Sequence, residues 1–322
     1  MVLRLDLNER ISRKKQLFYA RPKDYDAAKK TLASYCNISP IQLALTNGSF
    51  HALDLIFGSL LRAGTRVFIP VPTFPFYEKF EFSGHLKIEK VPCFDAMAVM
   101  KSLNRLSASV RAIYLANPNN PLGYGFTKTE LGNILDKVPK TRLFVVDEAY
   151  YEFCGITAKS LISKHKNLIV VRTLSKAFGL AGARIGYVIA NPQIIRRLER
   201  LKGPPYTINH FGLSLVAQLT SSDFHEAQNY ANEINQVKIK LTEKLSAAGI
   251  DFYQGLTNFL AIKTFDAKKV TGRLEKLGIL VNNLGNYTDS HRKLKNYIRL
   301  TIPPYSKLDW VSRSLLVSLV AK

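Results

Sequence analysis

The sequence is poor in cysteine. Its 322 residues contain only three, Cys36, Cys93 and Cys154, which are widely spaced and odd in number. This usage does not suit a disulfide framework and indicates the reducing environment of the cytoplasm. The sequence also has no Cys-x-x-Cys pair and no histidine-rich cluster, so we expect no bound metal.

Long apolar stretches are lacking as well. No segment approaches the roughly 20 apolar residues that a membrane-spanning helix requires, so we expect no membrane partner. Residues 1–10 alternate apolar and charged side chains, unlike the apolar centre of a secretory signal. These absences again favour a cytoplasmic protein.

Acidic residues are scarce relative to basic ones. The chain has 24 aspartates and glutamates against 46 lysines and arginines, which gives a net charge of +22. Such an excess can indicate a nucleic-acid partner. However, the basic residues are spread along the whole chain and no aromatic–basic RNA-binding motif occurs. We therefore do not expect a nucleic-acid partner, and the positive charge could equally attract anionic substrates.

Apolar runs of strand length alternate with helical patterns in the middle of the chain. The expected strands are residues 66–69, 86–91, 111–115, 143–146, 168–172 and 184–189. The expected helices are residues 49–62, 75–83, 127–137 and 192–201. This alternation predicts an α/β fold with a mostly parallel sheet covered by helices on both faces. In such sheets, ligands bind beyond the carboxyl ends of the strands.

The pattern changes after a Gly-Pro-Pro turn at residues 203–205. Two helical patterns and three short strands follow, with a closing helix, at residues 209–220, 224–247, 258–263, 279–282, 297–301 and 307–320. We interpret this part as a smaller α/β domain. The expected large domain is residues 20–202, and residues 1–19 are expected to join residues 203–322 in the small one.

A lysine follows one expected strand in the segment TLSKAFGLAGARIGY, residues 173–187. Lys176 could form a Schiff base if burial and a nearby cation lowered its pKa. Thr173 and Arg184 could bind a phosphate beside it. Taken alone, however, Lys176 is more simply a surface lysine. The glycines of the segment do not match a dinucleotide-binding fingerprint.

A second polar group follows the strand in VVDEAYYEF, residues 145–153. Asp147 could pair with the protonated nitrogen of a pyridine ring and keep that ring an effective electron acceptor. Tyr150 could donate a hydrogen bond to the ring hydroxyl. A metal ligand or a helix N-cap remains an alternative for Asp147, although the chain has no phosphate-binding P-loop.

Three further loops carry weaker signals. Asn120, in NPNNPLG, could offer its amide to a phenolic oxygen, or simply belong to a tight turn. Gly48 and Ser49 open an expected helix whose first N–H groups could bind phosphate, although Ser49 could equally be an ordinary N-cap. Phe74 could stack on an aromatic ring or pack in the core.

Arg299 lies in the middle of an apolar strand pattern, NYIRLTIP, residues 296–303. A charge in such a position is costly unless it is paired. A substrate carboxylate or phosphate could pair with it bidentately. An internal salt bridge is the alternative.

Taken together, these motifs resemble those of the fold-type I aminotransferases, which depend on pyridoxal 5'-phosphate (PLP). In chain order the motifs are NGS, PTF, NPNNPLG, DEAY, SKAFGLAGAR and the late Arg299. Their sequences are most similar to those of the histidinol-phosphate aminotransferase branch and its relative, threonine-phosphate decarboxylase. The resemblance extends from about residue 5 to residue 299. It implies a large domain with a mostly parallel seven-stranded sheet flanked by helices, and a smaller α/β C-terminal domain.

The resemblance also implies a role for each candidate residue. Lys176 would hold PLP covalently and move the substrate proton, and Asp147 would pair with the pyridinium nitrogen. Tyr150 and Asn120 would contact the ring oxygen, and Phe74 would stack on the ring. The implied phosphate contacts come from Gly48, Ser49, the amide of Phe50, Thr173, Ser175 and Arg184.

Substrate and partner contacts are implied in the same way. Arg299 would bind the anionic group of the substrate. Tyr19 is placed like the family tyrosine that reaches the phosphate from the other subunit, which implies a homodimer with shared sites. The resemblance implies transfer of an amino group between an amino acid or amino-alcohol phosphate and a 2-oxo acid.

Departures from the family pattern concern the substrate pocket. Asn282 occupies the position of an arginine that helps to bind phosphate-bearing substrates. The N-terminal part, which usually covers the substrate, is shorter than usual, and Phe50 replaces a commonly acidic residue. We therefore expect an intact cofactor site and an altered substrate pocket.

Three other functions compete with this prediction. The segment GILVNNLGNY, residues 278–287, is also similar to the decarboxylase branch, so decarboxylation of an amino-acid phosphate is one alternative. A non-catalytic regulator that binds DNA through its charge is another. The third alternative is a serine acyl enzyme, because Ser163 and Lys166 match its Ser-x-x-Lys motif, but no partner motif follows.

Overall fold

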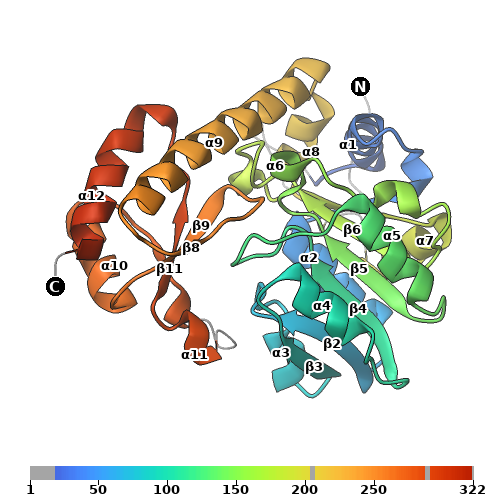
Figure 1. The fold of residues 1–322 in the computed structure, drawn as a ribbon. Coiled ribbons are helices and arrows are strands. Elements are labelled where there is room, and N and C mark those ends of the chain that lie inside the picture. The colour runs from blue at the N-terminus through green and yellow to red at the C-terminus, as the bar shows by residue number, and fades with distance from the viewer. Residues whose placement is uncertain (1–18, 204–206, 287–290, 321–322) are drawn as a thin grey trace.

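The computed structural model describes residues 19–203, 207–286 and 291–320. Residues 1–18 of the expected small domain, and Pro204 and Pro205 of the expected break, lie outside this description. Figure 1 shows two units of unequal size joined by the long helix α9 (Ser221–Ala247). Within the described part of the chain, no helix is both long and apolar enough to cross a bilayer.

The larger unit is built on a seven-stranded sheet with the order β1-β7-β6-β5-β4-β2-β3. The strands from β6 to β3 are parallel to their neighbours, whereas β7 runs antiparallel to both β6 and β1. The mostly parallel seven-stranded sheet expected from the sequence is therefore confirmed. The strands are β1 (Leu43–Thr46), β2 (Thr65–Val71), β3 (Leu86–Pro92), β4 (Val110–Ala116), β5 (Leu143–Asp147), β6 (Leu168–Thr173) and β7 (Gly186–Ala190).

Helices cover both faces of this sheet, which explains why its strands are apolar on both sides. Val146 and Val170 face one core, and Val145 and Val171 face the other, because successive strand residues point in opposite directions. The first core contains α1 (Pro22–Tyr35), α4 (Ala96–Leu103), α5 (Lys128–Lys137) and α8 (His210–Ala217). The second contains α2 (Gly48–Asp54), α3 (Glu78–Phe82) and α7 (Pro192–Leu201).

Several expected elements differ in their details. The strand expected at residues 279–282 is observed only as Asn282–Asn283, and the helix expected at residues 75–83 begins at Glu78. The helix expected at residues 49–62 starts at Gly48 with Asn47 as its N-cap, so Ser49 is not the cap, and it ends in a π-helical turn at Leu55–Leu60. The strand expected from residue 184 begins only at Gly186. The reason is the left-handed backbone of Arg184, whose φ of 54° does not fit a strand.

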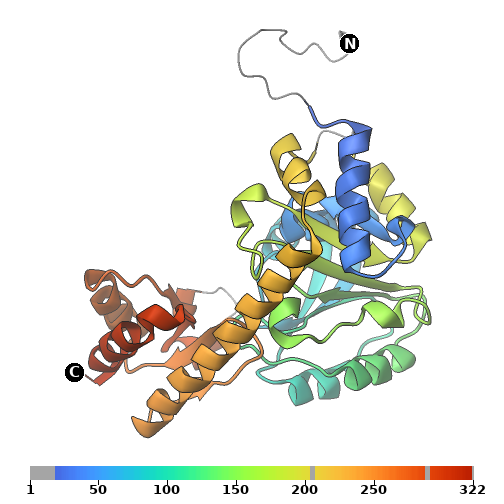
Figure 2. The ribbon, with the colours of Figure 1, turned by 90° about the horizontal axis from the view of Figure 1, so that it is seen from above.

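The smaller unit contains a four-stranded antiparallel sheet in the order β10-β11-β9-β8. One side of α9 packs against this sheet, and the same helix reaches back to the larger unit (Figure 2). The remaining elements are α6 (Tyr151–Cys154) in the larger unit, and β8 (Phe252–Tyr253), β9 (Phe259–Lys263), α10 (Ala267–Lys276), β10 (Asn282–Asn283), α11 (His291–Leu294), β11 (Tyr297–Thr301) and α12 (Leu308–Val320).

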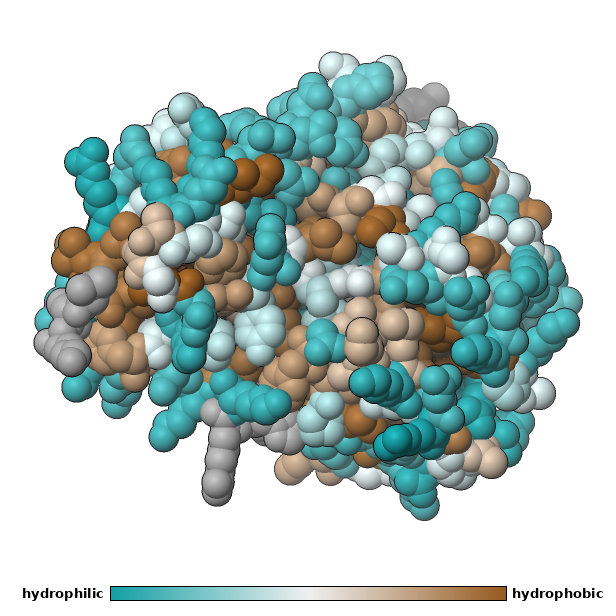
Figure 3. All heavy atoms as spheres, in the orientation of Figure 1, coloured by the Kyte–Doolittle hydropathy of each residue, from teal (hydrophilic) through white to brown (hydrophobic). Residues whose placement is uncertain are grey.

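The position of α8 bears on the domain boundary. Its Leu213 and Val216 are buried in the first core of the larger unit together with residues of α1. We therefore propose that the boundary lies near Thr220, where α9 begins, rather than at residue 203. In Figure 3, hydrophilic side chains cover much of the outer surface, and less polar ones gather near the middle of the view, between the units.

Candidate active site

The carboxyl ends of the central parallel strands border a cavity of about 100 Å³. This is the edge of the sheet at which a ligand is expected. The cavity brings together residues that are far apart in the sequence. Those that the sequence analysis had singled out are Ser49, Phe74, Asn120, Asp147, Tyr150 and Lys176.

Asp147 is the last residue of β5 and is almost fully buried in this cavity. Its Oδ2 accepts a hydrogen bond from the Tyr114 hydroxyl at 3.0 Å, and its Oδ1 accepts one from the N–H of Ala149 at 3.1 Å. Burial raises the pKa of Asp147 to about 6, although the hydrogen bond from Tyr114 opposes the rise. The carboxyl is therefore held in one orientation and can change its charge near neutral pH.

Lys176 lies in the turn after β6, on the same side of the sheet edge. Its Nζ is 5.6 Å from the centre of the Tyr150 ring. Desolvation lowers the pKa of the Lys176 ammonium, and the nearby guanidinium of Arg299 lowers it further, while Asp147 acts in the opposite direction. An amine with a lowered pKa loses its proton more readily, as a nucleophile or a base requires.

Next to the cavity, three strands bring hydroxyls and a guanidinium together around Gly186. Gly186 pairs in register with Thr46 of β1 and Thr173 of β6. A methyl group on Gly186 would lie 2.4 Å from the nitrogen of Ser49, so this position has room only for glycine. The first turn of α2 therefore packs directly on β7.

The same place carries donors suited to an anion. The Arg184 guanidinium lies over Gly48, since a methyl group there would be 2.6 Å from Nη2. The hydroxyls of Thr173 and Ser175 are 2.9 Å apart, and the N–H of Ser175 donates to Thr173 Oγ1 at 3.1 Å. Hydroxyls and a guanidinium of this kind bind phosphate. We call this group the anion cradle: Gly48, Ser49, Thr173, Ser175 and Arg184.

The smaller unit reaches the cavity wall through Arg299, which lies in the middle of β11. Its Nη1 donates a hydrogen bond to Asn120 Oδ1 at 2.5 Å. Its guanidinium carbon is 5.2 Å from the centre of the Phe259 ring. Phe259 in turn contacts Tyr150 edge-on, with the ring centres 5.3 Å apart.

Three expected site residues contribute no side chain to the cavity or to the anion cradle. Phe50 is exposed, and its ring contacts Phe74 edge-on at 6.1 Å. Asn282 is exposed on β10, directly opposite Arg299 in the strand register. Tyr19 is exposed just before α1. The cavity is thus built from this chain without these side chains.

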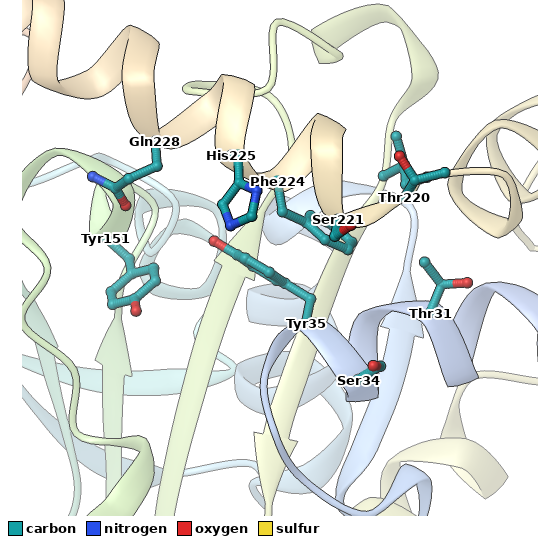
Figure 4. A pocket seen from close by; sticks show the side chains of 10 residues that line it. Thr31, Ser34, Tyr35, Tyr151, Thr220, Ser221, Phe224, His225 and Gln228 are labelled. Carbon is teal, nitrogen blue, oxygen red and sulfur yellow. The ribbon is translucent and has the colours of Figure 1, made fainter.

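A larger cavity, of about 640 Å³, lies between the end of α1 and the start of α9 (Figure 4). Tyr35, Phe224 and His225 lie along it, together with several hydroxyl groups. Its described lining includes no lysine, arginine or carboxylate. Because it offers neither an amine for a Schiff base nor a fixed positive charge for a phosphate, we place the active site at the smaller cavity.

The sequence comparison decides the family. Residues 4–309 match the family described as aminotransferase class I and II. The chain belongs to this family. It is a PLP-dependent aminotransferase, and the aminotransferase predicted from the sequence motifs is confirmed.

The Ser-x-x-Lys pair considered for a serine acyl enzyme lies elsewhere. Ser163 and Lys166 are exposed and precede β6, at the end of that strand remote from Lys176.

Individual relatives agree with this assignment. A histidinol-phosphate aminotransferase of Thermoanaerobacter sp. (strain X514) is 32% identical over 89% of this chain and 80% of its own length. The PLP complex of histidinol-phosphate aminotransferase from Sinorhizobium meliloti has the same fold, with a TM-score of 0.80, 24% identity, and coverage of 94% of this chain and 83% of its own. L-threonine-O-3-phosphate decarboxylase from Porphyromonas gingivalis also shares the fold, with a TM-score of 0.76, 22% identity, and coverage of 92% and 89%.

The sequence analysis did not single out four residues of the cavity lining, which are Tyr114, Ala116, Pro118 and Ala149, or the supporting residue Phe259. Tyr114 holds Asp147 from the neighbouring strand β4, and Phe259 supports Tyr150 and Arg299 from β9. A weak signal existed for Tyr114, which lies two residues before the end of its strand and so on the same face as Ala116, another residue of the cavity wall. Phe259 carried no such signal.

Proposed function

We propose that this aminotransferase moves an amino group between an amino acid or an amino-alcohol phosphate, such as histidinol phosphate, and a 2-oxo acid. The observation that supports this most directly is that Lys176, Asp147 and Asn120 line one cavity beside the anion cradle, and that Arg299 donates to Asn120. The 32% identity to the Thermoanaerobacter enzyme supports the choice of substrate class.

The residues present suit PLP. The glycine at position 48 leaves room for Arg184 beside the first turn of α2, which is where the phosphate would be held. Asp147 would accept the pyridinium N–H, Asn120 and Tyr150 would contact the ring oxygen, and Phe74 would stack on the ring. The phosphate contacts that we propose are Gly48, Ser49, the amide of Phe50, Thr173, Ser175 and Arg184. When bound, PLP supplies an electron-accepting ring that stabilises negative charge on the alpha carbon of the substrate.

The protein's own groups would then bind and move protons. Lys176 Nζ would hold the cofactor and would take the proton from the alpha carbon of the substrate, which the lowered pKa of Lys176 favours. Asp147 keeps its proton-accepting oxygen in place through Tyr114 and Ala149. Arg299 releases Asn120, at least in part, when it binds the anionic group of the substrate.

Substrate preference is proposed to depend on the β10–β11 edge. Asn282 lies opposite Arg299 and carries a neutral amide, so it would bind a second anionic group less strongly than an arginine would. We also propose a homodimer in which Tyr19 of one subunit reaches the phosphate of the other. We propose a cytoplasmic location as well, because all three cysteines are free.

A panel of amino donors tests the proposed reaction. Purified enzyme with PLP is mixed with histidinol phosphate, threonine phosphate or common amino acids, and the loss of the lysine-bound absorbance is followed together with carbon dioxide release. We expect a donor to convert the cofactor to its amine form without release of carbon dioxide. Stoichiometric carbon dioxide from threonine phosphate would support the decarboxylase alternative, which the Porphyromonas fold also fits.

A further inference from the structure

Strands β5 and β6 each end in two consecutive polar residues. In each pair, one side chain points to one face of the sheet and the other side chain points to the opposite face. Asp147 and Glu148 follow one another at the end of β5, and Arg172 and Thr173 end β6. Because strand residues alternate in direction, Asp147 and Thr173 face the cavity and the anion cradle. Glu148 and Arg172 face the opposite side, toward α6.

On that opposite side, Glu148 and Arg172 form a buried ion pair. Arg172 donates to Glu148 Oε2 from Nε at 2.9 Å, and its Nη2 lies 2.8 Å from the same oxygen. The two side chains are only 0% and 2% exposed. Both groups are therefore shielded from the solvent that weakens surface pairs.

Neighbouring groups satisfy the rest of the pair. Thr157 accepts a hydrogen bond from Arg172 Nη2 at 2.8 Å and donates one to Glu148 Oε2 at 2.9 Å. The N–H of Ala158 donates to Glu148 Oε1 at 2.6 Å. The guanidinium carbon of Arg172 lies 3.5 Å from the centre of the Tyr151 ring. These contacts hold both side chains in a single conformation, because a change of rotamer in either one would break several hydrogen bonds.

This ion pair joins the carboxyl ends of β5 and β6 on the face of the sheet opposite the cavity. The N–H of Glu148 donates to the Val171 carbonyl at 2.8 Å, so the backbone also links the two strands at this point. A buried ion pair adds little net stability compared with apolar residues of similar size. Its geometric effect is therefore the more distinctive contribution.

We propose that the Glu148–Arg172 ion pair is a positioning device that fixes Asp147 relative to Thr173. It thereby sets the position of the Asp147 carboxylate, which would contact the ring nitrogen, relative to the anion cradle. The proposal rests on the PLP site proposed above. Neither residue touches that site, and each acts through its neighbour in the chain.

Glu152 provides a matched control, because it is a buried acid in the same region without a bond to Arg172. It is 3% exposed and accepts a hydrogen bond from the Tyr35 hydroxyl at 3.3 Å. Glu152→Gln changes the same kind of group as Glu148→Gln. It leaves the contact between the two strand ends intact.

The experiment compares PLP affinity with folding stability. Apoprotein of the wild type, Glu148→Gln, Arg172→Lys, Glu152→Gln and the double variant Glu148→Leu/Arg172→Met is titrated with PLP, and the melting temperature of each apoprotein is measured. By analogy with the outer partners of metal ligands, we expect Glu148→Gln and Arg172→Lys to weaken PLP binding by about 10-fold or more. We expect Glu152→Gln to leave the affinity unchanged.

The double variant separates positioning from stability. Replacing both members of a buried pair by apolar residues often restores stability. We expect this variant to regain the melting temperature of the wild type but not its PLP affinity. Recovery of both would show that the pair only stabilises the fold, and would overturn the proposal.

Two other results have separate meanings. If the double variant does not fold, Arg172→Lys decides, and unchanged PLP affinity in that folded variant would overturn the proposal. Failure of the wild type itself to take up PLP would instead remove the proposed function on which the positioning role rests.

Discussion

Arg299 and Asn120 are 179 positions apart in the sequence, yet the guanidinium of the first donates directly to the amide oxygen of the second. The bond joins β11 of the smaller unit to the loop after β4 of the larger one. The proposed substrate anchor is thus linked to a proposed contact of the cofactor ring, and a substrate anion must compete with Asn120 for the guanidinium.

Arg299→Lys tests the anchor. A lysine cannot form the bidentate contact that a guanidinium makes with a carboxylate or phosphate. Loss of one hydrogen bond to a charged group costs about 1.5–3 kcal/mol, so we expect the KM for the amino donor to rise roughly 10- to 100-fold. Steady-state kinetics measure this change. Arg142→Lys is the control, because the Arg142 guanidinium donates to the Ser107 carbonyl away from the cavity, and an equal rise in KM there would argue against an anchoring role.

Lys176→Ala should abolish both turnover and the visible absorbance that arises when PLP is bonded to a lysine. The amine is required for covalent attachment and for proton transfer. Lys238 offers a matched control: burial lowers its pKa to about 8, and its Nζ donates to the Thr257 carbonyl away from the cavity. Lys238→Met should keep the absorbance after PLP is added. Visible absorbance that persisted in Lys176→Ala would disprove the assignment.

Asp147 should make PLP binding sensitive to pH near 6. Burial raises the pKa of its carboxyl to about 6, so the carboxylate needed by a pyridinium nitrogen is lost as the pH falls through this value. We expect apoprotein titrations to show weaker PLP binding below about pH 6. Asp147→Asn should weaken binding at pH 8 and remove this pH step, and a step that survived in the variant would belong to another group.

The stability of the apoprotein should respond in the opposite direction. Because the pKa of folded Asp147 lies above its ordinary value, its contribution to the free energy of unfolding is full below about pH 4 and is lost as the pH rises through 6. Asp147→Asn should therefore raise the apoprotein's free energy of unfolding at pH 8, by up to about 3 kcal/mol. Urea unfolding at pH 8 and pH 4 checks this, and a variant less stable at pH 8 would contradict it.

Tyr114→Phe should shift the pH dependence without removing the carboxylate. The Tyr114 hydroxyl donates to Asp147 Oδ2, and this bond lowers the pKa of the carboxyl. Without it, the pKa rises further, and the midpoint of the PLP-binding profile should move upward by roughly 1–2 pH units. Identical profiles for the variant and the wild type would mean that Tyr114 only fills space.

Gly186→Ala should damage the anion cradle. The added methyl group would lie 2.4 Å from the Ser49 nitrogen, so α2 or β7 must move. We expect a lower melting temperature and a greater loss of affinity for PLP than for pyridoxal, which lacks the phosphate. Gly182→Ala is the control, since a methyl group there has open space within 4 Å. Equal losses for PLP and pyridoxal would place the damage elsewhere.

The sequence predicted the central strands closely, because β4, β5 and β6 are mainly apolar runs of strand length. It missed β1 and α4, which are short and carry little periodic signal. It also missed the longer helices α1 and α10, whose apolar positions are interrupted by many charged residues. It placed the start of β7 two residues early, since the left-handed conformation of Arg184 depends on the packing of Gly186 against α2 rather than on local propensity.

The candidate site was predictable only in part. The parallel strands β4, β5 and β6 are neighbours, so their carboxyl ends meet at one edge of the sheet. The residues at or just after these ends, Asn120, Asp147 and Lys176, therefore line one cavity. The contact between Tyr114 and Asp147 depends on the register of β4 against β5, which no local pattern specifies. The same is true of the Glu148–Arg172 pair, whose members are spaced by a whole helical crossover.

The division of the cavity between two units has a consequence for how such an enzyme can change. The side chains proposed to hold PLP belong to the larger unit, apart from the partner's tyrosine, whereas Arg299 and Asn282 lie on one small sheet of the other. Substitutions on strands β10 and β11 should therefore alter which amine is accepted while leaving the coloured, PLP-loaded protein intact. New specificities could be selected on these two strands without rebuilding the machinery they all share.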